Sequence, residues 1–148
     1  MGDPALRVKR LRRSAKLPAR GSPVASGLDV HADLEELGGT IQLGVQPTLV
    51  PTGFAVEVPA GYEVQVRPRS GLSRLGVVVA FGTVDADYRG EIFVNMSAAF
   101  VEGGGYTVQH GDRIAQLVVA PVVLAEVEEV DELRDSERGE RGFGSTGR

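Results

Sequence analysis

Apolar and polar residues alternate along several short stretches of this chain. In YEVQVR, residues 62–67, every second side chain is apolar. The stretch EIFVNMSAAF, residues 91–100, repeats the pattern, and one face would be formed by Ile92, Val94, Met96, Ala98 and Phe100. Because successive side chains of a strand point to opposite faces, this period of two predicts half-buried strands. The β-branched stretches at residues 40–53 and 54–59 are also predicted as strands.

Two further stretches carry signals of a different kind. Residues 113–130, RIAQLVVAPVVLAEVEEV, predict two buried strands separated by Pro121. Residues 70–76, SGLSRLG, predict the one short helix, with Ser70 as its cap and with Leu72 and Leu75 on one side. The other possible helical turn, DLEEL at residues 33–37, is too short to decide.

Turn signals separate these elements and point to a fold class. Pro-Ala-Gly at residues 59–61 and three glycines at residues 103–105 are typical of turns. Many short strands with turns between them predict an all-β fold, a distorted jelly roll or β-barrel with one short helix. We expect a single β domain over residues 1–135 and a flexible C-terminal arm over residues 136–148.

The composition is that of an ordinary globular domain. Of the 148 residues, 42% are hydrophobic and 24% are charged, which is enough apolar material for one core. Cysteine is absent, so the chain has no disulfide. No apolar run approaches the roughly 20 residues that span a bilayer, and residues 1–10 lack a hydrophobic signal core. We therefore expect a cytoplasmic protein with no membrane partner.

The net charge of -4 hides an asymmetry along the chain. Lysine and arginine dominate residues 1–20, whereas aspartate and glutamate dominate residues 126–137. The basic segment could bind nucleic acid, or it could form a first strand whose charges discourage edge pairing. The lack of aromatic residues for base stacking favours the strand, so we predict no nucleic-acid partner.

Five stretches carry polar residues that interrupt the strand pattern. They are SGLDVHA (26–32), RPRSGL (67–72), GTVDADYRGEI (82–92), GDRIAQL (111–117) and RGERGFGSTGR (138–148). Free N–H groups at a helix start beside Arg69 are suited to an anion. Purely structural explanations also exist: Asp29 and Asp112 as turn residues, Arg89 paired with Glu91 or a neighbouring carboxylate, and Gln116 as a satisfied core amide.

Taken together and in this order, the five stretches resemble the five motifs of the trimeric dUTP diphosphatases, or dUTPases. The opening VKRLRRSAKLPARGSPVASGLDV also resembles the family's usual N-terminal segment, so the resemblance runs nearly end to end. It implies a homotrimer with three active sites, each built from more than one subunit. It also implies hydrolysis of dUTP to dUMP and pyrophosphate, which limits uracil in DNA and supplies dUMP for thymidylate synthesis.

The resemblance implies a role for each matched residue. Asp85 would be the catalytic carboxylate that activates a water for attack on the α-phosphorus, because a carboxylate can accept the water's proton. Tyr88 would pack on the deoxyribose and leave no room for a ribose 2'-hydroxyl. Asp29 would have a supporting role. The positions implied to contact the phosphates are Arg69, Ser70, Gly71 and Gln116.

The resemblance also implies how base and metal are held. A hairpin around residues 79–84 would read uracil through its backbone, with Thr83 and Val84 lining the pocket. Here the sequence departs from common bacterial members, since residues 76–84 form a shorter segment. Mg²⁺ would be held by the substrate phosphates and water, with no direct protein ligand. A zinc site is not expected, because there is no cysteine and His31 and His110 are isolated in the sequence.

The last motif implies an arm that closes over bound nucleotide. Phe143 would stack on uracil and Arg138 would pair with the γ-phosphate, while donors would come from Gly144, Ser145 and Thr146. Ordering an arm costs about 1–2 kcal/mol per residue, so we expect closure only when a full triphosphate supplies contacts. Arg141 stands where the family usually has glycine, and it either contacts a phosphate or points to solvent.

Parts of the sequence also fit other functions. A dCTP deaminase, alone or bifunctional, shares the fold and a stretch like RSGLSRLG, but deaminases lack the DYRGE tyrosine context and the Phe-Gly-Ser-Thr-Gly tail. A P-loop NTPase fails because the glycine-rich tail has no lysine and no helix after it. The fold alone leaves open a non-catalytic regulatory homologue or a structural jelly roll. The presence of Asp85, Tyr88, Gln116 and the tail favours an active enzyme.

Overall fold

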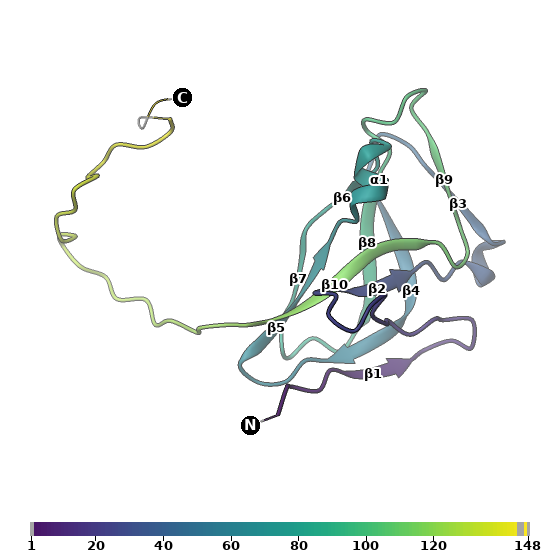
Figure 1. The fold of residues 1–148 in the computed structure, drawn as a ribbon, viewed down its shortest axis with the longest axis horizontal. Coiled ribbons are helices and arrows are strands. Elements are labelled where there is room, and N and C mark those ends of the chain that lie inside the picture. Colours follow the sequence, from purple (N-terminus) through teal and green to yellow (C-terminus); the bar gives the residue numbers. More distant parts are fainter. Residues whose placement is uncertain (1, 145–146, 148) are drawn as a thin grey trace.

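Short antiparallel strands make up the body of the molecule (Figure 1). The computed structural model describes residues 2–144 and residue 147. One sheet has the order β1 (Arg7–Arg10), β4 (Thr48–Glu57), β8 (Glu91–Ser97), β6 (Val78–Val79). A second has the order β2 (Leu28–His31), β10 (Arg113–Pro121), β5 (Tyr62–Arg67), β7 (Gly82–Val84), and a third joins β3 (Thr40–Leu43) to β9 (Tyr106–Gln109). The predicted all-β class is confirmed, although these sheets do not close into a barrel among the described residues.

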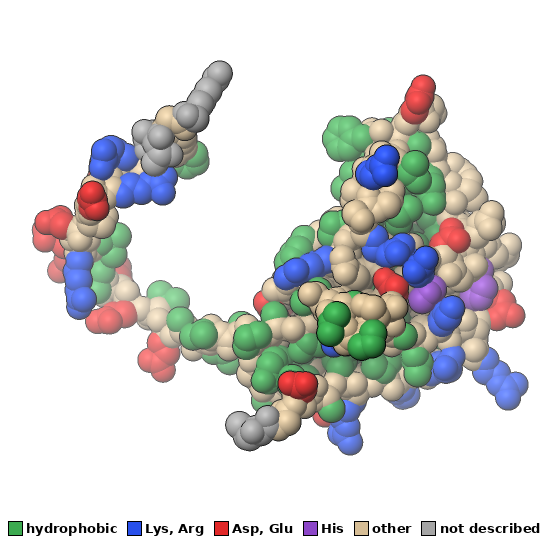
Figure 2. Space-filling model, viewed as in Figure 1, with side chains coloured by type: hydrophobic (Ala, Val, Ile, Leu, Met, Phe, Trp, Pro, Cys, Tyr) green, Lys and Arg blue, Asp and Glu red, His purple; other side chains and the backbone are tan. Residues whose placement is uncertain are grey.

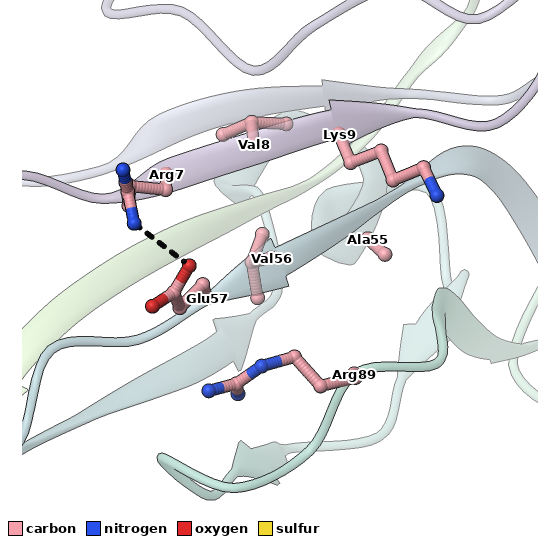
Figure 3. A pocket seen from close by; sticks show the side chains of 7 residues that line it. All are labelled: Arg7, Val8, Lys9, Ala55, Val56, Glu57 and Arg89. Atoms are coloured by element: carbon pink, nitrogen blue, oxygen red, sulfur yellow. Dashed lines mark hydrogen bonds and ion pairs between the residues drawn. The ribbon is translucent and has the colours of Figure 1, made fainter.

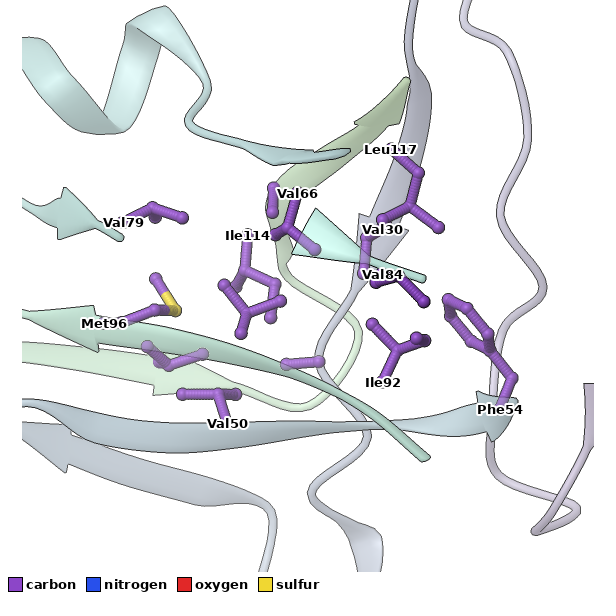
Figure 4. Packing of buried hydrophobic residues seen from close by; sticks show 14 of the residues in the cluster. Val30, Val50, Phe54, Val66, Val79, Val84, Ile92, Met96, Ile114 and Leu117 are labelled. Carbon is purple, nitrogen blue, oxygen red and sulfur yellow. The ribbon is translucent and has the colours of Figure 1, made fainter. Parts of the chain in front are cut away.

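The core lies where side chains of the two four-stranded sheets meet (Figure 4). In β5 the alternation predicted from the sequence is confirmed, since Val64 and Val66 are buried and Arg67 is exposed. In β8 the predicted face is buried as far as Ala98. Phe100 is wrongly assigned to that face. Its side chain is 80% exposed, because the strand ends at Ser97 and the chain turns, with the Val101 amide donating to the Ala98 carbonyl.

The second strand predicted within residues 113–130 is wrong. Strand β10 ends at Pro121, which pairs with Tyr62, the first residue of β5. The Val122 amide donates to the Gly61 carbonyl at 2.9 Å, and beyond it the chain runs away from the sheets (Figure 1). A strand needs a neighbour to satisfy its backbone, and the neighbouring strand ends here. The apolar side chains of this segment are consequently exposed, among them Val123, Leu124, Val127 and Leu133.

The predicted short helix is confirmed as α1 (Ser70–Arg74). The cap prediction is wrong: Ser70 is the first helical residue and Arg69 occupies the cap position without a side-chain cap bond. Leu72 packs against the core, whereas Leu75 is exposed at the end of the helix and does not share that face. The undecided stretch at residues 33–37 contains a 3₁₀ turn, Glu35–Leu37.

A partly buried ion network ties the N-terminal segment to the first residue of β8. Arg12 Nε lies 2.8 Å from Asp33 Oδ2, and both terminal guanidinium nitrogens of Arg12 donate to the Glu91 carboxylate. The Asp33 side chain is only 1% exposed. Burial raises the pKa of Glu91, but hydrogen bonds from Arg12 and the Gly53 amide outweigh burial and leave the pKa below its ordinary value. Burial likewise raises the pKa of Asp33, and bonds from Ser14 and Arg12 lower it overall.

This network predicts a dependence of stability on pH. Carboxyl groups with a lowered pKa in the folded state stabilise it above their unfolded pKa values, about 3.9 for Asp and 4.3 for Glu. That stabilisation is lost as the pH falls through the folded pKa values. We expect Arg12→Met to lower the free energy of unfolding by about 3 kcal/mol at pH 7, because it removes the cation that pairs with the buried Asp33 and the partly buried Glu91. The loss should shrink below roughly pH 4, as the carboxyls become neutral.

Urea unfolding of both proteins at pH 7 and pH 3 measures this effect. The control is Arg7→Met, which breaks the exposed pair between Arg7 and Glu57, with 3.3 Å between nitrogen and oxygen. That variant should change the free energy of unfolding by less than about 1 kcal/mol. An Arg12→Met effect of equal size at both pH values would contradict this account of the network.

Candidate active site

The turn after β7 carries the two residues to which the sequence assigns most of the chemistry. The Tyr88 amide donates to the Asp85 carbonyl at 3.1 Å, which brings both side chains to one loop. Asp85 is exposed and Tyr88 is 43% exposed. They line a pocket of about 240 Å³ with Val66, Gly82, Thr83, Val84, Glu91, Ile92 and Phe93. The structure therefore brings Thr83, Val84, Asp85 and Tyr88 together.

The ring of Tyr88 is held over the loop by contacts within it. Its hydroxyl donates to the Glu91 carbonyl at 2.9 Å. Gly90 makes room for the ring, because an added Cβ there would overlap the Tyr88 hydroxyl. The pairing of Arg89 with Glu91 considered from the sequence is wrong. Arg89 donates to the carbonyls of Ala86 and Tyr88, while the Glu91 carboxylate accepts from Arg12.

A second cluster gathers around Asp29 in β2, at the start of α1. Asp29 lies between two arginines, with Oδ1 3.4 Å from Arg69 Nε and Oδ2 3.6 Å from Arg113 Nη1. Asp29 is thus a strand residue that orients cations, and its interpretation as a turn residue is wrong. Asp112 is a turn residue, as the sequence suggests, and its carboxylate accepts from the Gln109 amide at 2.8 Å. Figure 2 shows basic side chains gathered on this face between α1 and β10.

The predicted phosphate-contacting residues lie in this second cluster. Arg69 and Gly71 line a pocket of about 430 Å³ together with Leu72, Leu75, Tyr106, Asp112, Arg113 and Ile114. Gln116 lies close by on β10, and its Nε2 donates to the Pro68 carbonyl at 3.0 Å. Arg113 was not singled out from the sequence. Its position directly after Asp112 in the fourth motif was the available signal.

The two clusters lie at opposite ends of β5 within one chain. Val84 of β7 pairs with Val64 near the start of β5, so Asp85 lies beside that start. Arg69 follows the other end of β5, beyond Arg67. At about 3.3 Å per residue, this separates Asp85 from Arg69 by roughly 15–20 Å along the strand. A single chain therefore does not place the Asp85 loop beside the arginines.

A third pocket, of about 320 Å³, lies over the edge strand β1 and its neighbour β4 (Figure 3). Its basic side chains are Arg7, Lys9 and Arg89, and Arg7 is paired with Glu57. Residues 7–10, three of which are basic, thus form the first strand that is one of the two possibilities in the sequence. Although Arg89 belongs to the third motif, neither Asp85 nor Tyr88 lines this pocket.

The arm predicted to close over a nucleotide is directed away from both clusters (Figure 1). Arg138 and Arg141 each donate from Nε to the other's carbonyl, at 2.7 and 3.1 Å. Phe143 is fully exposed with a positive φ of 51°, and Gly144 follows with φ 88°. The other two predicted arm contacts, Ser145 and Thr146, lie outside the described residues.

The histidines have different surroundings. Burial lowers the pKa of His31, which lies in β2. His110 Nδ1 accepts from the Leu34 amide at 3.0 Å and lies 3.6 Å from Asp33 Oδ1.

Over residues 2–144 and 147, no three side chains of His, Asp or Glu are grouped so as to hold a metal ion. Over the same residues, no helix has the length and apolar character needed to cross a membrane.

Comparison with known proteins gives one consistent result. A family model described as dUTPase matches residues 13–147. The chain is 49% identical over 144 residues to the deoxyuridine 5'-triphosphate nucleotidohydrolase of Desulfotalea psychrophila, covering 93% of this chain and 91% of that protein. Identity to the enzyme of the same name from Beijerinckia indica is 51% over 155 residues, covering 97% and 92% of the two chains.

Solved structures agree with the sequence relatives. The dUTPase of Staphylococcus bacteriophage 80alpha with bound dUpNHpp superposes with a TM-score of 0.87 at 30% identity, covering 97% of this chain and 99% of that one. A D95N mutant dUTPase from phage phi11 superposes with a TM-score of 0.77 at 26% identity, covering 87% and 98%. The latter is described as revealing the coordination of a structural Mg(II) ion.

Proposed function

Because the chain belongs to the dUTPase family and hydrolyses dUTP to dUMP and pyrophosphate, we propose that the reaction takes place at the pocket beside Asp85 and Tyr88. The observation that carries this proposal is the loop after β7, which places a solvent-accessible carboxylate and an aromatic ring at one pocket. The carboxylate suits activation of a water, and the ring suits packing against a sugar.

Asp85 is the general base in this proposal. Its carboxylate accepts a proton from water as the water attacks the α-phosphorus, and the bond from that phosphorus to the pyrophosphate oxygen breaks. Thr83 and Val84 supply backbone groups of the edge strand β7 to the uracil base. Tyr88 packs on the deoxyribose and excludes a ribose 2'-hydroxyl by its bulk. The wall of the pocket behind them is apolar and includes Val66, Ile92 and Phe93.

The second cluster binds the phosphates in this proposal. Arg69 supplies positive charge, and Asp29 fixes the direction of its guanidinium through the 3.4 Å ion pair. Ser70 and Gly71 offer backbone N–H groups at the start of α1, and Gln116 offers its amide. Arg113 adds a second cation beside Asp29. These groups neutralise the negative charge of the bound triphosphate and the negative charge that develops on its oxygens as the bond to the α-phosphorus breaks.

Magnesium fits this site only as an ion carried by the substrate. Two carboxylates among the described residues line the pocket, and that of Glu91 is already bonded to Arg12 and the Gly53 amide, which leaves Asp85. Mg²⁺ accepts phosphate and water oxygens readily. The substrate phosphates and water would therefore hold it, with no direct protein ligand. When bound, the ion neutralises phosphate charge and fixes the conformation of the triphosphate.

Each active site is built from more than one subunit of a homotrimer in this proposal. One chain holds Asp85 and Arg69 at opposite ends of β5, so a neighbouring subunit must bring the second cluster to the Asp85 loop. The exposed apolar side chains of residues 123–133 offer surface that assembly would bury. Sedimentation should give three times the 15.7 kDa chain mass. A monomer at working concentration would contradict this assembly.

Gly27 gives a test of the role of Gln116. An added Cβ at Gly27 would overlap Gln116 Oε1 and lie 2.9 Å from its Cβ, so Gly27→Ala must displace the amide. Losing a hydrogen bond to a charged phosphate costs about 1.5–3 kcal/mol, so we expect kcat/KM for dUTP to fall roughly 10- to 100-fold. Gly44→Ala is the control, because nothing lies within 4 Å of an added Cβ there. Equal kinetics for the two variants would refute the assigned role of Gln116.

The site of attack can be read from isotope incorporation. Hydrolysis of dUTP in ¹⁸O-water should place the label in dUMP if water attacks the α-phosphorus. Label in pyrophosphate would overturn that part of the proposal. The alternative activity, deamination of dCTP, is tested in parallel, and release of ammonia from dCTP would favour a deaminase of the same fold.

A further inference from the structure

The ring of Tyr88 is connected to a partly buried ion network at Glu91, the first residue of β8. We propose that Glu91 and Arg12 are positioning residues: they hold the backbone onto which Tyr88 is fastened, and so they set discrimination between deoxyribose and ribose. This inference rests on the proposed role of Tyr88 as the sugar platform. Arg12 does not line the candidate pocket, and Glu91 lines it with its carboxylate already bonded to Arg12 and the Gly53 amide.

The connection begins at the hydroxyl of Tyr88. It donates to the carbonyl of Glu91 at 2.9 Å, so the ring's position depends on where that carbonyl lies. Gly90, between the two residues, leaves the ring just enough space, since a Cβ there would overlap the hydroxyl. The ring therefore rests on the backbone of residues 90 and 91.

The side chain of Glu91 fixes that backbone. Strand β4 has an irregular register opposite β8 between Pro51 and Ala55, and within it the Gly53 amide donates to Glu91 Oε1 at 2.8 Å. In the same irregular segment, the buried Thr52 hydroxyl donates to the Ile92 carbonyl at 2.6 Å. A free backbone amide inside a sheet needs an acceptor, and the Glu91 carboxylate supplies it. The start of β8 is thus bonded to β4 through the Glu91 side chain and through the Ile92 carbonyl.

Arg12 completes the anchor and connects it to the N-terminal segment. Its guanidinium donates to both carboxylate oxygens of Glu91 and, through Nε, to Asp33 at 2.8 Å. The Asp33 side chain is buried, and a Cβ on Gly53 would overlap Asp33 Oδ2, so the network is tightly packed on that side. Gly53 itself has φ +75°, which favours glycine. A bidentate arginine pair in a tightly packed setting fixes geometry as well as charge.

A positioning role differs from a merely stabilising one in what it changes. Loss of stability lowers the active fraction and reduces turnover of dUTP and UTP by the same factor. Loss of ring position lets a 2'-hydroxyl fit, so it changes the ratio of kcat/KM for dUTP to that for UTP. That ratio does not depend on how much of the protein is folded.

The experiment measures this ratio for the full-length protein with dUTP and UTP. Glu91→Ala should lower the ratio at least about tenfold, chiefly through a higher KM for dUTP with a smaller change in kcat. Glu91→Gln keeps an acceptor for the Gly53 amide and for Arg12, and it should retain the ratio within about twofold. Two further variants test the same connection where Glu91→Ala does not fold. Tyr88→Phe removes only the hydroxyl that donates to the Glu91 carbonyl, and Arg12→Met removes the partner of the Glu91 carboxylate. Each should lower the ratio of kcat/KM for dUTP to that for UTP.

Tyr88→Ala separates the two ideas under test. If Tyr88→Ala lowers the ratio and Glu91→Ala, Tyr88→Phe and Arg12→Met leave it unchanged, the platform stands and the positioning role is overturned. If Tyr88→Ala itself leaves the ratio unchanged, the proposed platform fails and the inference fails with it. A lowered ratio in Glu91→Ala that Glu91→Gln restores supports the positioning role.

Discussion

Asp85→Asn should abolish measurable turnover of dUTP and leave nucleotide binding and the fold nearly unchanged. Loss of a general base costs about 10²- to 10⁴-fold in rate, and asparagine cannot take the proton. Asp85 is exposed, and within the described residues its carboxylate is tied into no hydrogen bond or ion pair. The substitution therefore removes chemistry without removing packing.

Asp87 provides a matched control two residues along the same loop. It is also an exposed carboxylate, and it does not line the candidate pocket. Asp87→Asn should keep near-normal turnover. Initial rates with dUTP, together with calorimetric binding of a non-hydrolysable dUTP analogue, distinguish the two variants. Near-normal turnover in Asp85→Asn would show that the assigned mechanism is wrong.

Truncation after Asp135 should leave a folded core but reduce kcat/KM for dUTP by at least about 100-fold. The last strand of the core, β10, ends at Pro121. The described residues beyond Asp135 lie away from the sheets, so their removal takes no packing from the strands (Figure 1). Stacking of an aromatic side chain on a base contributes about 1–3 kcal/mol, and a closed arm also excludes water from the reaction. The truncated protein should therefore unfold at the same temperature as the full chain.

Two single substitutions locate the effect within the arm. Phe143→Ala should account for much of the loss, because Phe143 is the only aromatic residue of the segment 138–148. Arg141→Gly restores the residue that the family usually has, and it should change kcat/KM only if Arg141 contacts a phosphate. Unchanged activity after truncation would rule out the role of the arm as a lid.

The sequence predicted the parts of the fold that depend on local pattern. Strand β5 follows from its alternation, because one face of the sheet is buried and the other is not. The segment after Pro121 has strand-like residues but no neighbour to pair with in its own chain. Pattern alone does not reveal whether a partner exists, so the second strand predicted there was wrong.

The candidate site divides in the same way. Thr83, Val84, Asp85 and Tyr88 are close in sequence, and their shared pocket follows from one strand and one turn. The pairing of Arg12 with Glu91 joins residues 79 positions apart. This pairing depends on the irregular register of β4, which leaves the Gly53 amide free to donate to Glu91. The local sequence pattern does not predict that irregularity.

Pyrophosphate release from dUTP, compared with dCTP, dTTP and UTP under identical conditions with Mg²⁺, tests the central claim most directly. We expect release from dUTP to exceed release from each of the other nucleotides by at least about 100-fold, the discrimination that steric exclusion and backbone readout can supply. Comparable release from UTP or dTTP, or no release from dUTP, would contradict the account.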